Sequence, residues 1–324
     1  MNQNDPPQLQ LGLLRSSDRT LGLKESISKS VKSGDVVLDA GCGTGLLSLL
    51  ALQAGASKII AIDSYDLQLA KAIAMENNAA DAIEFVQADL RELDLSTTSL
   101  GNNKLDVIIA MLYSGHPRFD RDQVILKQSI VNRYLAPDGI VIPNQVRFWA
   151  YPCDWADHDF SQYCLESERY VRDIEQQLGI KLQAFNHYLQ KITGDDLGVM
   201  IRNINVYSGN NILFPHSSPD RLERSMSRIL SKPLLVADIN YQNRNNGNSF
   251  PENITFDITE TGRITAIIWV RELLHNDLLI SSREVASLVR QPLWLHQGEK
   301  CVARLDDIWQ ATNVVSIDNT SDIF

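Results

Sequence analysis

The sequence is poor in cysteine and histidine, the residues that build disulfide frameworks and most zinc sites. Its 324 residues contain four cysteines (Cys42, Cys153, Cys164 and Cys301) and six scattered histidines. No two cysteines have the C-x-x-C spacing that is typical of zinc modules and redox motifs. We therefore expect neither a disulfide framework nor a metal site.

The chain also lacks an excess of basic residues and any apolar run long enough to span a bilayer. Its 30 Lys and Arg against 40 Asp and Glu give a net charge of −10, whereas proteins that bind nucleic acid present a basic face. The segment from Met1 to Leu11 is polar and has neither the basic nor the apolar region of a signal peptide. We expect a cytoplasmic protein with no nucleic-acid or membrane partner.

The most informative stretch runs from Val36 to Gly45 and reads VVLDAGCGTG. It predicts an apolar strand that ends near an acidic residue, a turn with three alternating glycines, and then an apolar helix from Leu46 to Ala54. Glycines accept positive φ angles and allow a ligand to lie against bare main chain. In an open α/β sheet such a turn lies at the carboxyl end of the strand, where ligands bind.

The spacing of these glycines separates two cofactors. The dinucleotide fingerprint G-x-G-x-x-G needs its third glycine one place further along, where this chain has Leu46. Gly41, Gly43 and Gly45 instead give the G-x-G-x-G turn of S-adenosylmethionine enzymes. We therefore expect S-adenosylmethionine as the cofactor, and not NAD.

The pattern of the remaining chain predicts two domains. From Val36 to Pro143, short apolar strands alternate with helical segments, which indicates a parallel α/β sheet. The helix before residue 134 is expected to start at Asp122, with that residue as its N-cap. We expect an N-terminal segment and helix (1–30), a Rossmann-like domain (31–143) and an antiparallel β-barrel-like domain (144–324).

The second half carries its own expected elements. A helical arm is expected over about 157–189 and a short helix over 220–230. The period-two alternation in Ile254–Ile258 and in Ile264–Val270, with Thr261-Gly262 between them, predicts that these two segments form a hairpin.

Three aspartates follow predicted strands at the cofactor edge. Asp63 is placed to accept hydrogen bonds from a ribose diol. Asp89 is placed either to accept from an adenine amino group or to cap the following turn. Asp39 either steadies the glycine turn, contacts the methionine ammonium of the cofactor, or has a local role only.

These pieces together resemble the class I S-adenosylmethionine-dependent methyltransferases, and more narrowly the protein arginine methyltransferases. Val36–Asp63 resembles their cofactor half, and the segment LLRSSDRT at residues 13–20 resembles the end of their helix before the sheet. The resemblance implies that Arg19 binds the cofactor carboxylate. Leu135–Pro143 resembles the family's exit into its β-barrel, and the arm over 157–189 resembles its dimerisation arm, which implies a homodimer.

The loop after the predicted fourth strand departs from this family, which carries two glutamates there. Met111 stands in place of the first glutamate, and Asp120 or Arg121 falls near the second. The polar candidates for catalysis in this loop are Tyr113, His116 and Asp120. His116 titrates near neutrality if unperturbed and is a candidate general base. His296, in the segment LWLHQ, is a further candidate through a loose match to the family's His-Trp barrel motif.

These observations favour an enzyme that transfers a methyl group from S-adenosylmethionine to a nitrogen or oxygen nucleophile. The expected acceptor is a small molecule or peptide of a biosynthetic pathway, because the loss of a glutamate removes one anion that would clamp a guanidinium. Two alternatives stay open: a protein arginine N-methyltransferase with an altered acceptor loop, and a non-catalytic cofactor-binding scaffold.

Overall fold

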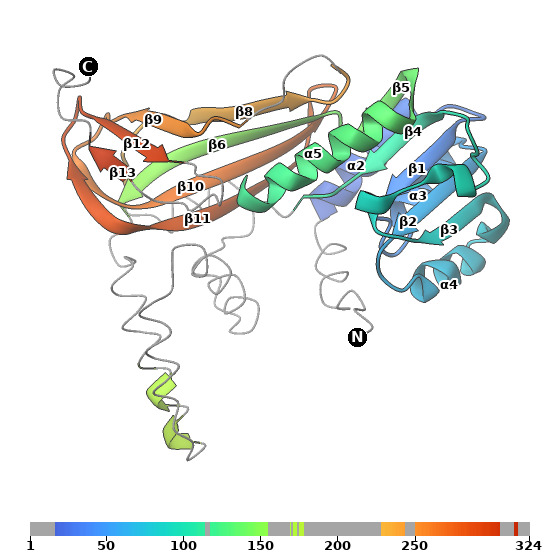
Figure 1. Ribbon diagram of the computed structural model, residues 1–324, viewed down its shortest axis with the longest axis horizontal. Helices are drawn as coiled ribbons and strands as arrows, with labels where there is room; N and C mark the ends of the chain where they lie inside the picture. Colours follow the sequence, from blue (N-terminus) through green and yellow to red (C-terminus); the bar gives the residue numbers. More distant parts are fainter. Residues whose placement is uncertain are drawn as a thin grey trace.

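The structure, a computed structural model, describes residues 17–113, 117–154, 228–243, 250–304 and 314–316, with 169, 171–173 and 175–177 in addition. A parallel sheet occupies one end of the molecule and long antiparallel strands occupy the other (Figure 1). The predicted fold class is thereby confirmed: an α/β unit of Rossmann type is followed by an antiparallel β region.

The first sheet has five parallel strands in the order β3-β2-β1-β4-β5. Its central strands are almost continuously buried, which explains why they are unbroken runs of Val, Ile and Leu. The order reverses between β1 and β4, so the ligand edge of this sheet lies where those two strands end. The strands are β1 (Val36–Ala40), β2 (Lys58–Asp63), β3 (Ile83–Gln87), β4 (Leu105–Ala110) and β5 (Leu135–Ile142).

Helices connect these strands and join the two sheets. Helix α2 packs against both α3 and the second sheet, and α5 packs against β4 and β5. The α-helices around the first sheet are α2 (Ser17–Ser30), α3 (Leu46–Ala54), α4 (Gln68–Glu76) and α5 (Pro117–Tyr134); the short 3-10 turns are η1 (Ala80–Ala82), η2 (Leu90–Glu92) and η3 (Leu95–Thr97). The sequence predicted that α5 begins at Asp122, and this prediction is wrong. The helix starts five residues earlier, at Pro117.

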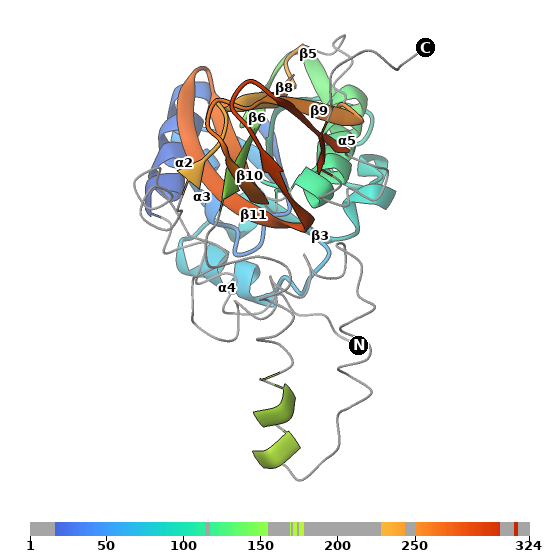
Figure 2. The same cartoon turned by 90° about the vertical axis from the view of Figure 1, so that its left-hand side faces the viewer.

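The second region is built on one long hairpin that curls around an apolar interior (Figure 2). Strand β10 pairs with β11 on one side and β6 on the other, and a smaller sheet has the order β13-β12-β9. Its strands are β6 (Gln145–Asp154), β7 (Arg228–Ile229), β8 (Leu234–Asn240), β9 (Asn253–Asp257), β10 (Gly262–His275), β11 (Leu278–Leu295), β12 (Lys300–Arg304) and β13 (Val314–Ser316).

Two sequence expectations in this region are wrong. The segments 254–258 and 264–270 do not form a hairpin, because β9 pairs with β12 while β10 turns back on β11. The turn that decides this is Asn276-Asp277, in which both residues have positive φ (48° and 65°), as a tight two-residue hairpin turn requires. The short helix expected over 220–230 does not extend to its predicted end, since Arg228 and Ile229 form a strand.

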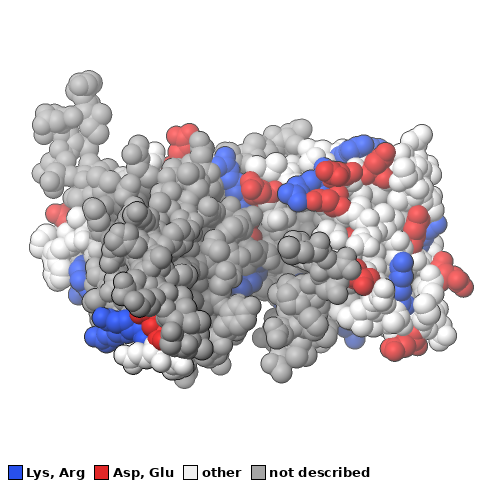
Figure 3. Space-filling model, turned by 60° about the horizontal axis from the view of Figure 1, so that its bottom comes forward, with Lys and Arg blue, Asp and Glu red and all other residues white. Residues whose placement is uncertain are grey.

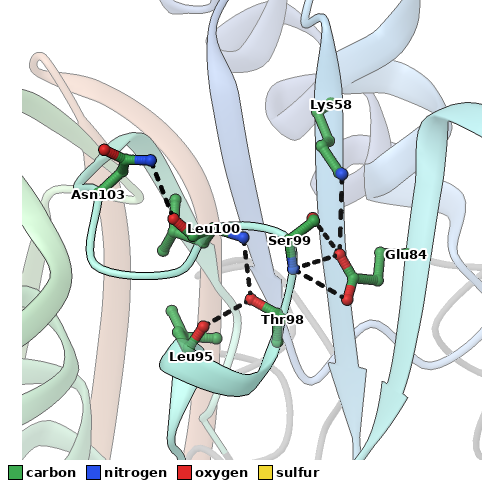
Figure 4. A network of polar contacts seen from close by, with 7 residues as sticks. All are labelled: Lys58, Glu84, Leu95, Thr98, Ser99, Leu100 and Asn103. Atoms are coloured by element: carbon green, nitrogen blue, oxygen red, sulfur yellow. Dashed lines mark hydrogen bonds and ion pairs between the residues drawn. The ribbon is translucent and has the colours of Figure 1, made fainter.

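A polar network holds the chain that enters β4 against β2 and β3 (Figure 4). The carboxylate of Glu84 accepts hydrogen bonds from the amide and the hydroxyl of Ser99 and lies 3.9 Å from the ammonium of Lys58. The hydroxyl of Thr98 donates to the carbonyl of Leu95 at 2.7 Å and accepts from the amide of Leu100 at 3.2 Å. These bonds fix the turn that delivers β4, and hence the loop after it, to the ligand edge.

Charged side chains of both signs are mixed over the described surface that faces the viewer in Figure 3. Neither sign forms a continuous patch on the coloured part of this face. Among the described residues, no helix combines the length and apolar character needed to cross a bilayer.

Candidate active site

The glycine turn between β1 and α3 lies at the centre of the candidate site. Gly41, Gly43 and Gly45 have φ angles of 78°, 53° and 74°, which residues with a Cβ adopt only at a cost. The amides of Gly41 and Cys42 both donate to the carbonyl of Ile62, at 2.8 and 2.9 Å. The turn is therefore bare main chain, fastened to the end of β2.

Asp63 ends β2 and braces this turn with its carboxylate. Oδ2 accepts from the amide of Gly43 at 2.8 Å, and Oδ1 accepts from the amide of Tyr65 at 3.1 Å. The residue is only 8% exposed. Because a carboxylate oxygen accepts about two hydrogen bonds, each oxygen keeps capacity for one hydroxyl of a bound diol.

Asp39 lies beneath the turn and has a local partner. It is buried, and its carboxylate accepts the hydroxyl proton of Ser48 at 2.7 Å, which ties β1 to α3. Burial raises the pKa of Asp39 to about 6, although the bond from Ser48 acts in the opposite direction. This contact fits the expectation of a role in steadying the turn.

Asp89 makes the contacts of a capping residue. It is the N-cap of η2, where its carboxylate accepts from the amide of Arg91 at 2.9 Å. The Arg91 guanidinium also binds both carboxylate oxygens, and these bonds lower the pKa of Asp89. An adenine amino group would have to share an oxygen with Arg91.

Arg19 lies in the first turn of α2 and is partly buried, which lowers the pKa of its guanidinium. The positive charge of Arg19 helps to lower the pKa of Arg271 in β10. Arg19 therefore lies near the junction of the first sheet with the second region.

The loop after β4 brings Met111, Leu112 and Tyr113 to the ligand edge. A side chain of Leu112 lies against the glycine turn, since a Cβ added to Gly41 would meet its Cδ2 at 3.0 Å. The hydroxyl of Tyr113 donates to the hydroxyl of Tyr241 at 2.8 Å. The pKa values of both tyrosines are raised by burial, so both hydroxyls stay protonated near neutral pH.

Asp120 lies in the first turn of α5 and is completely buried. The negative charge of Asp120 raises the pKa values of Tyr113, Tyr241 and Arg271. The carboxylate therefore lies near the loop after β4 and near the second region. The structure therefore brings the predicted residues Tyr113 and Asp120 together.

Lys127, Tyr241 and Arg271 belong to the same buried cluster and were not anticipated from the sequence. The ammonium of Lys127 donates to the carbonyls of Ala110 and Pro143, at 3.2 and 2.8 Å, and lies 4.3 Å from the Tyr241 ring centroid. Burial lowers the pKa of Lys127 well below its usual value. A sequence signal exists, because Lys127 falls on the buried stripe of α5 that includes Val124.

Of the other two predicted catalytic residues, the structure describes His296 alone. His116 lies outside the described residues. His296 is exposed just after β11, where its amide donates to Glu299 at 2.7 Å. That turn is at the opposite end of the β10–β11 hairpin from His275, which contacts Ser30 of α2. The structure thus leaves His296 remote from the ligand edge.

The sequence profile of the methyltransferase domain family matches residues 31–198, slightly more than half of the chain. The chain belongs to the methyltransferase domain family. S-adenosylmethionine is the methyl donor that membership implies. The prediction of a class I methyltransferase resembling the protein arginine methyltransferases is confirmed.

Individual relatives match less than half of the chain. The ribosomal protein arginine N-methyltransferase rmt3 of Schizosaccharomyces pombe is 35% identical over 140 residues, 42% of this chain and 24% of that protein. Protein arginine N-methyltransferase 1 of Dictyostelium discoideum is 31% identical over 159 residues, 46% of this chain and 42% of that protein. The matches therefore span less than half of the length of these curated relatives.

Solved structures match most of the chain, at low sequence identity. A Trypanosoma brucei PRMT1 enzyme–prozyme heterotetrameric complex with AdoHcy has a TM-score of 0.60 at 17% identity, covering 91% of this chain and 86% of that one. Arabidopsis thaliana protein arginine methyltransferase 10 has a TM-score of 0.58 at 16% identity, with coverages of 90% and 85%. The fold thus extends the likeness beyond the first sheet.

Proposed function

We propose that the protein binds S-adenosylmethionine over the Gly41–Gly45 turn and transfers its methyl group to a nitrogen or oxygen nucleophile. The observation that carries this proposal is the turn itself, in which three positive-φ glycines are braced by the Asp63 carboxylate at the end of β2. The turn follows β1, at the edge of the sheet where the strand order reverses between β1 and β4; this is the switch point at which ligands bind.

The residues at this edge fit the cofactor. The free capacity of the Asp63 oxygens suits the two ribose hydroxyls, and the main chain of the turn leaves room for the methionine moiety. Arg19 supplies a cation for the cofactor carboxylate, and Asp89 lies at the end of β3 for the adenine amino group. When bound, the cofactor supplies an electrophilic methyl group on a sulfonium, which needs no metal to react.

The task left to the protein is to position the acceptor and to take up its proton. Methyl transfer is an in-line displacement, so orientation supplies most of the acceleration. The Asp120 carboxylate is our candidate for orienting the acceptor, and the Tyr113–Tyr241 pair for shaping the same region. His116 remains a candidate base.

The acceptor we favour is a small molecule or a peptide, and its reactive atom is not a guanidinium nitrogen. Met111 occupies the position after β4 that would need a carboxylate to clamp a guanidinium, and it packs against the apolar core. The cluster beside it contains the buried guanidinium of Arg271, which would repel another guanidinium.

A second candidate, protein arginine N-methyltransferase, is favoured by the names of the relatives that match 42% and 46% of the chain. Transfer of labelled methyl groups from S-adenosylmethionine to arginine-rich peptides separates the two. We expect no methylarginine above background; its efficient formation would establish the second candidate.

A non-catalytic scaffold is the remaining alternative, and cofactor binding tests it. We expect saturable heat on titration of the full chain with S-adenosylhomocysteine, at one molecule per chain. If no binding occurs, the proposed enzyme is excluded and only the scaffold remains.

We also propose that the protein is a homodimer, from the resemblance of residues 157–189 to a dimerisation arm. Most of that segment lies outside the described residues. Light scattering at micromolar protein should give twice the chain mass of 36.4 kDa; the mass of a single chain would contradict the proposal.

A further inference from the structure

A second feature of the buried cluster is its pair of opposed arginines. Arg271 of β10 and Arg283 of β11 are direct partners in the antiparallel ladder, so their side chains leave the sheet on the same face. Like charges placed directly opposite each other destabilise a sheet. Such a pair persists where an anion offsets the repulsion.

Arg271 is poorly satisfied by the protein itself. It is 5% exposed, and its Nε atom finds no hydrogen-bond partner among the described residues. Its Nη2 atom makes one long bond, of 3.4 Å, to the hydroxyl of Ser281. The guanidinium carbon lies 5.7 Å from the centroid of the Tyr113 ring, which directs this cation toward the loop after β4.

The charges around Arg271 do not balance. Burial lowers its pKa to about 10; Asp120 acts in the opposite direction, and Arg283 and Arg19 lower the pKa further. Three arginines thus act together with Asp120, which is the carboxylate among the described residues that attracts Arg271. Within the part of the chain that the structure describes, no second anion offsets this positive charge, and a buried unpaired guanidinium is costly without one.

The cofactor cannot supply the whole deficit. S-adenosylmethionine carries one carboxylate, but its ammonium and sulfonium are both positive, so it adds net positive charge to the site. A further anion has to come with the acceptor. Guanidinium groups bind carboxylates and phosphates through paired N–H donors.

We propose that the methyl acceptor carries an oxyanion, a carboxylate or a phosphate, which binds Arg271 and Arg283. This inference rests on the proposed methyltransferase function and names the acceptor class for the same site. The oxyanion anchors the acceptor, while a separate nitrogen or oxygen atom reaches the methyl group. Tyr113 and Tyr241 offer aromatic surface beside the anchor.

The test uses the full chain saturated with S-adenosylhomocysteine and two matched pairs of probes. Benzoate is compared with benzamide, and phenyl phosphate with phenol, in thermal unfolding and in calorimetry. We expect at least one anion to raise the unfolding temperature and to bind at least about tenfold more tightly than its neutral partner, the effect of one charge-assisted contact. The pair that responds identifies the oxyanion.

Three variants assign the effect. Arg271→Gln should abolish the preference for the anion and Arg283→Gln should reduce it, while S-adenosylhomocysteine affinity changes by less than about threefold. The control is Arg228→Gln. Arg228 is an exposed arginine of β7 that pairs with Glu260, and this variant should behave as the unaltered protein. Arg271→Lys retains a positive charge, and should keep part of the preference if Arg271→Gln does not fold.

Several results would overturn the proposal without touching the cofactor site. Equal binding of charged and neutral probes, or an unchanged preference in Arg271→Gln, would do so. A tenfold loss of S-adenosylhomocysteine affinity in Arg271→Gln would instead assign this arginine to the cofactor carboxylate. Failure of the unaltered chain to bind S-adenosylhomocysteine would reject the proposed function itself, and is measured first.

Discussion

The glycine turn and the buried cluster differ in how their polar groups are satisfied. In the turn, Asp63 and Asp39 both accept hydrogen bonds from nearby groups of the turn itself, of α3 and of the chain after β2. In the cluster, Arg271 retains an unsatisfied Nε and stands opposite Arg283. The polar groups of the turn are thus satisfied by the protein itself, whereas Arg271 keeps an unsatisfied donor among the described residues.

The two regions also differ in the origin of their residues. The turn is made by one continuous segment, Val36–Asp63, whereas the cluster collects side chains from β10, α5 and the loops after β4 and β8. On the proposed function, the turn binds the cofactor that the family shares, and the cluster selects the acceptor. The following predictions test each half of the contrast, beginning with the largest effect.

Asp63→Ala should weaken S-adenosylhomocysteine binding by about 100-fold, because it removes charge-assisted bonds to the ribose and releases the Gly43 amide. Calorimetry measures the change. The matched control is Asp66→Ala, which removes an exposed carboxylate three residues away that only caps Gln68. Equal losses in the two variants would show that Asp63 has no special role.

Gly41→Ala should reduce the free energy of unfolding by about 2 kcal/mol, through positive-φ strain together with the Leu112 side chain 3.0 Å from the added Cβ. Gly34→Ala is the control, because Gly34 has φ of 94° with nothing within 4 Å. Its cost is expected at about 1 kcal/mol, from strain alone. Urea unfolding gives both values. Identical costs in the two variants would contradict the expected steric contribution from Leu112.

His275, where β10 meets α2, should make the protein less stable in acid. Burial lowers its pKa to about 4 from 6.5. As the pH falls from 6.5 toward 4, the unfolded chain takes up a proton before the folded chain does, so this stability is lost. Between pH 7 and 5 the loss is about 2 kcal/mol, measured by urea unfolding.

His275→Gln should remove most of this dependence, and His296→Gln, at an exposed position, should leave it intact. If His275→Gln retained the full loss of stability between pH 7 and 5, the assignment to His275 would be wrong.

Asp39, under the glycine turn, should act in the opposite direction. Its pKa is raised to about 6 from 3.8, so the folded chain binds the proton more tightly and stability decreases as the pH rises through about 6. From pH 7 to 5 the unaltered protein should gain about 1 kcal/mol relative to Asp39→Asn, which does not titrate. A constant difference between the two proteins over this range would contradict the raised pKa.

The contrast also explains how far the sequence alone can lead. The strand, turn and helix of Val36–Ala54 could be predicted because apolar runs and glycine spacing are local signals that the fold obeys. Strand partners in the second region could not, since the decisive Asn276-Asp277 turn competed with an equally plausible turn at Thr261-Gly262. The sequence did offer a signal for the first turn, because Asn and Asp are residue types that tolerate the positive φ angles of a tight hairpin.

The buried cluster was largely hidden for a different reason. Tyr113 and Asp120 could be identified from their place after β4, but their neighbours Tyr241 and Arg271 follow them by more than a hundred residues. Arg271 is buried at the end of the apolar run Ala266–Val270, which is a sign of a special role although it does not reveal the partner. Asp122 was wrongly predicted to begin the helix because aspartate is a common N-cap residue. The helix in fact starts at Pro117, so Asp122 lies inside it.

The most direct test of the central claim is a crystal structure of the full chain with S-adenosylhomocysteine. We predict that the nucleoside lies over Gly41–Gly45, with its ribose hydroxyls on the Asp63 carboxylate and its sulfur facing the loop after β4. A nucleoside bound elsewhere, or a glycine turn covered by the protein's own side chains, would contradict the account.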